Sequence, residues 1–185
     1  MRCFLKALSK AQLMSGHLFV DETKRRDYLM VVGVVLPKDL TPARKCMQGL
    51  ILPGQRRLHM KDERDSRKRQ ILSAIEKLDI EAMVYDAGNR YRTQRDARAA
   101  CLRAMVEDAT QHGHRHLILE RDATLENWDR QQLIEATRRL GSTVKYRHET
   151  AVAEPLLAIP DALAWAYAKG GDWRRRSCIR TVRQV

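Results

Sequence analysis

The sequence has few cysteines, and those it has are scattered. Four occur in 185 residues, at Cys3, Cys46, Cys101 and Cys178, and no two of them have the spacing of a zinc site or a redox pair. Widely separated thiols are typical of a reducing compartment. We therefore expect a cytoplasmic protein without a disulfide framework, and the cysteine pattern excludes zinc fingers and zinc deaminases.

Long apolar runs and the common nucleotide motifs are also missing. No apolar stretch approaches membrane-spanning length, and residues 1–14 are basic without a sustained apolar segment or a small-residue cleavage site. We expect neither membrane insertion nor secretion. The glycine-rich motifs of P-loop and dinucleotide-binding proteins are absent, as is a serine elbow of the hydrolase type.

What the chain has in excess is positive charge. Lysine and arginine number 35 against 23 acids, which gives a net charge of +12 and a pI near 10.0. The basic residues form four runs, Lys24-Arg25-Arg26, Arg56-Arg57, Arg67-Lys68-Arg69 and Arg174-Arg175-Arg176. Such clusters favour a polyanionic partner, with nucleic acid (DNA or RNA) the leading candidate. The alternative is a surface that is charged throughout because the source proteome is rich in arginine.

The apolar pattern alternates between strands and helices, which is typical of an α/β fold. Strands are expected over 17–22, 28–36, 80–85, 115–122 and 143–148. Helices are expected over 41–52, 63–78, 93–111, 127–140 and 155–169, followed by a basic segment, 172–185, with a turn and a final short element. The first two strands should form an antiparallel hairpin. The length fits one domain over 1–185.

Helix starts follow from capping residues. Thr41 before Pro42 predicts an N-cap with proline at the first helical position. Asp62 is expected to cap the next helix rather than to bind a ligand. Thr93 and Asp96 have the spacing of a capping box.

Three acids stand in apolar surroundings. Asp21 ends the strand segment 18–20, Glu120 ends 117–119, and Asp161 interrupts the apolar stripe of the last long helix. A carboxylate there is costly unless it is paired or binds a cation, and binding sites in α/β sheets gather at strand ends. Mg²⁺ and Mn²⁺ prefer such oxygen ligands. The pattern predicts Asp21, Glu120 and Asp161 as metal ligands in a site that could cleave phosphodiesters.

Further candidates for ligation or water orientation are Glu22, Asp122 and His59. Asp21 could instead pair with an arginine or cap the following turn, and Asp161, which follows Pro160, could cap a restarted helix. Glu22 could be an ordinary exposed acid, and Asp122 could be a turn residue. If the fourth strand continues through Asp122, its side chain should point to the same side as that of Glu120. The histidine-rich run 112–116 lacks zinc spacing and is expected to be a turn, while His148 could face the site.

Several segments together resemble a known family. They are HLFVDET, VVGVVLP, LHMKDERDSRKRQIL, LILERDA and EPLLAIPDALAWAYAKGGDWRRR, which span almost the whole chain. Their order is similar to that in domain-of-unknown-function family three thousand eight hundred, which is frequent in bacteria and phages. The first motif here is Asp-Glu-Thr where Asp-Glu-Ser is common, and Thr23 keeps the hydroxyl.

The resemblance implies an RNase H-like fold, a five-stranded mixed sheet of order 3-2-1-4-5 with strand 2 antiparallel and helices on its faces. It also implies catalytic acids at Asp21, at Glu120 or Asp122, and at Asp161. The leading hypothesis is a nuclease dependent on Mg²⁺ or Mn²⁺. The alternatives are a non-catalytic module that binds nucleic acid or protein on the same scaffold, and an accessory protein of a phage or defence operon that acts through residues 173–183.

Overall fold

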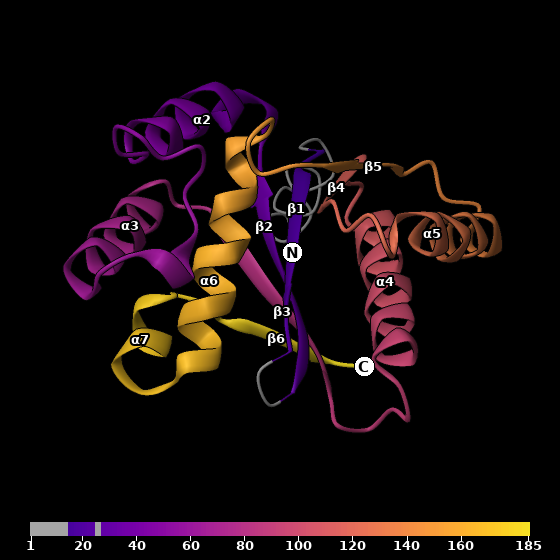
Figure 1. Cartoon of the computed structure of the whole chain (residues 1–185). Coiled ribbons are helices and arrows are strands. Elements are labelled where there is room, and N and C mark those ends of the chain that lie inside the picture. The colour runs from indigo at the N-terminus through magenta and orange to yellow at the C-terminus, as the bar shows by residue number, and fades with distance from the viewer. Residues whose placement is uncertain (1–14, 25–26) are drawn as a thin grey trace, which may run out of the picture.

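A six-stranded mixed sheet forms the centre of the protein (Figure 1). The computed structural model describes residues 15–24 and 27–185, so Cys3 and the Arg25-Arg26 pair lie outside the described residues. The sheet has the order β5-β4-β1-β2-β3-β6. The strands are β1 (His17–Thr23), β2 (Tyr28–Val35), β3 (Glu81–Gly88), β4 (His116–Glu120), β5 (Lys145–Glu149) and β6 (Thr181–Gln184).

Strand β2 is antiparallel to both β1 and β3, and the other neighbouring pairs are parallel. The sheet therefore contains the expected order 3-2-1-4-5 and the expected hairpin, but the expected number of strands is wrong. Strand β6 adds to the outer edge of β3, with Thr181 opposite Met83 and Gln184 opposite Asp86. Its mostly exposed residues carry no apolar alternation, so only backbone pairing with β3 defines it as a strand.

Helices cover both faces of the sheet (Figure 1). One face carries α2 (Leu40–Gly49), α3 (Asp65–Lys77), α6 (Ala158–Lys169) and α7 (Gly171–Arg176), and the other carries α4 (Gln94–Gln111) and α5 (Glu126–Leu140). Side chains of β1 alternate between the two cores, with Phe19 in the α6 core and Leu18 and Val20 in the α4 core. Within the described residues, none of the helices has the length and apolarity that crossing a membrane needs.

The capping predictions had mixed outcomes. Thr93 caps α4, since its hydroxyl accepts a hydrogen bond from the Asp96 backbone N–H at 3.1 Å. Thr41 is inside α2, which begins at Leu40 directly after the 3-10 turn η1 (Pro37–Asp39), so that prediction is wrong. Asp62 lies in the 3-10 turn η2 (Met60–Asp62) and does not cap α3. In both places a short 3-10 turn shifts the helix start, which the residue types alone did not indicate.

Helix α6 lies close against β2 because Gly33 has no side chain. A Cβ atom built there would stand 3.1 Å from Cγ2 of Ile159, closer than most real contacts. A glycine inside a strand often marks such a close approach. Ile159 is two residues before Asp161, so this contact sets the distance at which α6 presents Asp161 to the end of β1. A 3-10 turn, η3 (Pro155–Leu157), precedes the helix.

Candidate functional site

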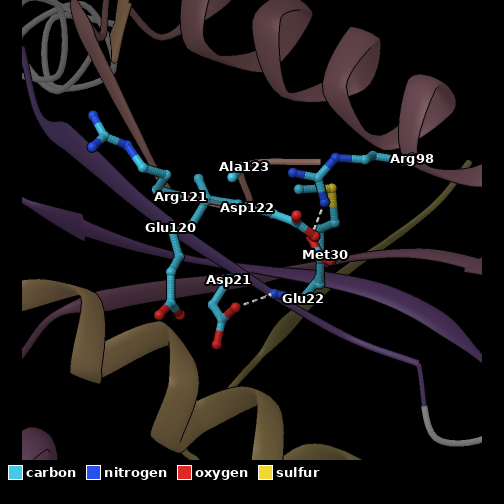
Figure 2. A pocket seen from close by; sticks show the side chains of 9 residues that line it. Asp21, Glu22, Met30, Arg98, Glu120, Arg121, Asp122 and Ala123 are labelled. Atoms are coloured by element: carbon cyan, nitrogen blue, oxygen red, sulfur yellow. Dashed lines mark hydrogen bonds and ion pairs between the residues drawn. The ribbon is translucent and has the colours of Figure 1, made fainter. Parts of the chain in front are cut away.

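Three of the predicted acids lie together on neighbouring elements, although β1 continues to Thr23, so the expectation that Asp21 ends its strand is wrong. β1 and β4 are parallel with Val20 opposite Leu119, which places the next residues, Asp21 and Glu120, side by side. Figure 2 shows both carboxylates pointing to the α6 side of the sheet. Burial, then the negative charges of Asp161 and Glu120, raise the pKa of Asp21 well above its ordinary value. The structure therefore brings Asp21, Glu120 and Asp161 into one cluster, called the acid cluster below.

The segment between α2 and α3 supplies cations to this cluster. Nη1 of Arg57 donates to Oε1 of Glu120 at 2.5 Å, and Nδ1 of His59 lies 3.3 Å from Oδ1 of Asp161. The backbone N–H of Met60 donates to the other oxygen of Asp161 at 2.7 Å. The interaction with Asp161 raises the pKa of His59 above its ordinary value of 6.5. His59 therefore lies where the sequence predicted it, while Arg57 was recognised only as part of a basic run.

Glu22 and Asp122 lie on the opposite side of the sheet (Figure 2). Glu22 pairs with Arg98 and, at 2.7 Å, with Lys24. Strand β4 ends at Glu120 and not at Asp122 as expected, so the condition under which Asp122 would share a side with Glu120 is not met. Asp122 instead accepts from the hydroxyl and backbone N–H of Thr124, and these bonds lower its pKa. Asp122 thus acts as a turn residue before α5.

A pocket of about 350 Å³ spans the two sides. Its lining consists of Val20, Asp21, Glu22, Met30, Arg98, Glu120, Arg121, Asp122 and Ala123. Four of these residues are acids and two are arginines.

A buried hydrogen-bond network around Arg98 holds Glu22, and the sequence did not predict it. Arg98 is only 2% exposed and binds Glu22, the hydroxyl of Tyr28 and both oxygens of Asp129. His148 lies 3.0 Å from Asp129, so it faces this buried ion pair and not the acid cluster. A signal was present, because Arg98 stands three and four residues before Cys101 and Leu102, on the apolar face of its helix.

The histidine run forms a turn, as predicted. His112 and Gly113 follow α4, and His116 opens β4 and stacks on His17 with ring centroids 4.4 Å apart. This pair lies at the start of β1, the end away from Asp21.

The acid cluster has ligands suited to Mg²⁺ or Mn²⁺, but in this structure its carboxylates interact with basic side chains of the protein. In the described ranges, no three His, Cys, Asp or Glu side chains are arranged to hold a metal ion as they stand. Glu120 is turned to Arg57, and Asp161 to His59 and the Met60 N–H. The donors are nevertheless the hard carboxylate oxygens that these ions prefer. Burial, and then the charges of Asp161 and Glu120, raise the pKa of Asp21, and a divalent cation would offset both effects.

Comparisons with known proteins support the fold. No protein-family model and no curated protein matches the chain. A solved structure described as the PCNA:RNase HII complex from Archaeoglobus fulgidus is similar, with a TM-score of 0.56 and 16% sequence identity. The match covers 85% of this chain and 73% of that one. The protein therefore has an RNase H-like α/β fold with a six-stranded sheet.

Proposed function

We propose that this protein is a divalent-metal-dependent nuclease that hydrolyses phosphodiester bonds. The observation that carries the proposal is the convergence of Asp21, Glu120 and Asp161, where burial and then the two neighbouring charges raise the pKa of Asp21. The similarity to an RNase HII in fold and the net charge of +12 support it. The resemblance to domain-of-unknown-function family three thousand eight hundred is likewise part of the proposal.

In this proposal Asp21, Glu120 and Asp161 would hold Mg²⁺ or Mn²⁺, which would supply Lewis-acid polarisation of the phosphodiester and a lowered pKa for a water molecule. The backbone N–H of Met60 fixes one oxygen of Asp161, which leaves the other for His59 or the cation. Arg57 pairs with Glu120, and its guanidinium would be able to bind phosphate if Glu120 held the cation instead. Glu22, clamped by Arg98, lines the same pocket from the other side.

The direct test is cleavage by the purified protein with Mg²⁺ or Mn²⁺ on single-stranded DNA, duplex DNA, RNA and an RNA–DNA hybrid. We expect cleavage of at least one substrate, lost in chelator and reduced at least about a hundredfold in Asp21→Asn and Asp161→Asn. Glu135→Gln, an exposed acid on α5, is the matched control and should cleave normally. Cleavage that persists undiminished in both cluster variants would refute the assignment and indicate a contaminating nuclease.

A second candidate is a binding module without catalysis. The ion pairs of Arg57 with Glu120 and His59 with Asp161 favour it, because they satisfy two acids without a metal. This function predicts nucleic-acid binding that weakens steeply with salt and no cleavage with either ion. Titration of the protein with Mn²⁺ in a calorimeter separates the two, since only the nuclease requires saturable binding that Asp21→Asn abolishes.

A further inference from the structure

Solvent reaches one narrow stripe of α6, and this stripe begins at the acid cluster. Asp161, Trp165 and Lys169 follow one another at four-residue intervals and are partly or fully exposed, with Ala168 beside them. The remaining residues of the helix are buried. Four-residue spacing places side chains on the same face, so Trp165 and Lys169 lie about 6 Å and about 12 Å along the helix from Asp161.

Basic side chains from α3 lie over the aromatic rings beside this stripe. Nζ of Lys68 is 4.6 Å from the ring centroid of Trp165, and the guanidinium of Arg69 is 5.1 Å from that of Trp173. The two tryptophan rings meet edge to face at 5.1 Å. Farther along, the guanidinium of Arg174 stacks on Tyr167. The rings attract these cations and stabilise their positions, and Arg69 and Arg174 are exposed whereas Lys68 is buried.

The flanking surface is strongly basic. Within 56–69 and 169–176, eight basic side chains are exposed against three acids, Asp62, Asp65 and Asp172. The basic ones are Arg56, Lys61, Arg64, Arg69, Lys169, Arg174, Arg175 and Arg176. Of the basic runs in the sequence, Arg174-Arg175-Arg176 contributes all three of its residues to this surface, and Arg56 and Arg69 are the exposed members of two others. Helices α3, α6 and α7 lie together on one side of the sheet (Figure 1).

We propose that this surface, formed by residues 56–64, α3, the α6 stripe and α7 and called the basic track, binds the phosphate backbone of a nucleic-acid strand that runs outward from the acid cluster. The inference rests on the proposed function for its starting point, the bond to be cut. A strand with one phosphate at the acids passes Trp165 and Lys169 within about three further nucleotides. Its phosphates meet arginine and lysine, and the tryptophans provide rings for sugar or base contacts.

The test measures binding without cleavage, so that it is independent of catalysis. Fluorescein-labelled single-stranded DNA, RNA and an RNA–DNA hybrid are titrated with full-length protein in chelator, and anisotropy is followed at about 50 to 200 mM salt. The track variant is the double substitution Arg69→Glu, Lys169→Glu. The control is Arg103→Glu, Arg138→Glu, on α4 and α5 across the sheet. The two double variants change the net charge by the same amount, and in each of them one substitution lies within a helix and the other in the last turn of a helix. Circular dichroism checks that both variants fold.

We expect the track variant to bind at least about tenfold more weakly and to lose about two units of slope in the plot of log affinity against log salt. The control should lose less than about threefold, and Arg69→Lys, Lys169→Arg should bind like the wild type. Equal losses in the two charge-reversed variants, or no salt-dependent binding by the wild type, would overturn the track. If the protein binds nucleic acid through the track but does not cleave it with Mg²⁺ or Mn²⁺ added, the nuclease proposal is refuted and the binding proposal is supported. If the wild type cleaves nucleic acid and the track variant binds it as tightly as the wild type, the nuclease proposal is supported and the track is refuted.

Discussion

Arg98 grips Asp129 with two parallel hydrogen bonds, from Nε at 2.6 Å and from Nη2 at 2.7 Å. The two residues are 2% and 1% exposed, so the pair is almost entirely removed from water. Nη1 of the same guanidinium donates to the hydroxyl of Tyr28 at 3.1 Å and pairs with Glu22 at the pocket. Arg98 thus joins α4 and α5 to the end of β1, and Asp129 holds its guanidinium in position.

Asp129→Ala should be among the most destabilising single substitutions on the α4 side. It leaves the guanidinium of Arg98 buried without two of its four hydrogen bonds, and breaking a buried pair costs about 3–5 kcal/mol in other proteins. Urea unfolding followed by circular dichroism measures the loss. Arg130→Ala, which breaks the exposed pair with Glu126 one residue along α5, should cost less than about 1 kcal/mol. Equal losses for the two variants would show that burial adds nothing to the Arg98–Asp129 pair.

The same pair predicts an acid-sensitive contribution to stability. Burial alone would raise the pKa of Asp129, but hydrogen bonds from Arg98 and His148 outweigh it and hold the pKa below its ordinary value of 3.8. Because the folded pKa is depressed, the contribution is complete above about pH 5 and is lost as the pH falls through the folded value. Urea unfolding at a series of pH values below about 5 should show a free energy of unfolding that falls less steeply in Asp129→Asn than in the wild type. Parallel curves would contradict the prediction.

Most strands of the sheet could be predicted because the residue types and the apolar pattern of these segments both indicate a strand. The β-branched run in β2 and the apolar segments before Asp21 and Glu120 indicate buried strands whatever surrounds them. The acids at those strand ends were conspicuous for the same reason, since a carboxylate after an apolar run is costly without a partner. Their mutual proximity then follows from the parallel pairing of β1 and β4.

What the sequence could not provide depends on contacts between distant segments. Strand β6 exists because its backbone pairs with β3, and its side chains carry no pattern. Arg57 belongs to a basic run whose members look equivalent in sequence, and only the path of the α2–α3 segment brings this one to Glu120. The orientation of Asp122 depended on where β4 ends, and an end point is the least certain part of a strand assignment.

Arg57→Ala should strengthen metal binding at the proposed site. The Arg57 guanidinium and a divalent cation compete for Glu120, and a partly exposed ion pair of this kind contributes about 0.2–1 kcal/mol. Its removal should therefore raise the affinity for Mn²⁺ by up to about fivefold in a calorimetric titration. Arg56→Ala, an exposed neighbour, should change the affinity little. Weaker Mn²⁺ binding in Arg57→Ala would show that the arginine supports the site and does not compete for it.

Gly33→Ala should disturb the packing that places Asp161. The added methyl group would stand 3.1 Å from Cγ2 of Ile159, in a sheet whose neighbouring strands leave β2 little room to shift. Overpacking of this kind costs about 1–3 kcal/mol, and displacement of α6 should also reduce cleavage, because Asp161 moves with Ile159. Gly49→Ala is the matched control: nothing lies within 4 Å of its added Cβ, and alanine in α2 should stabilise by up to about 1 kcal/mol. Unchanged urea unfolding in Gly33→Ala would mean that α6 can move away freely, and the spacing of the acid cluster would then need another cause.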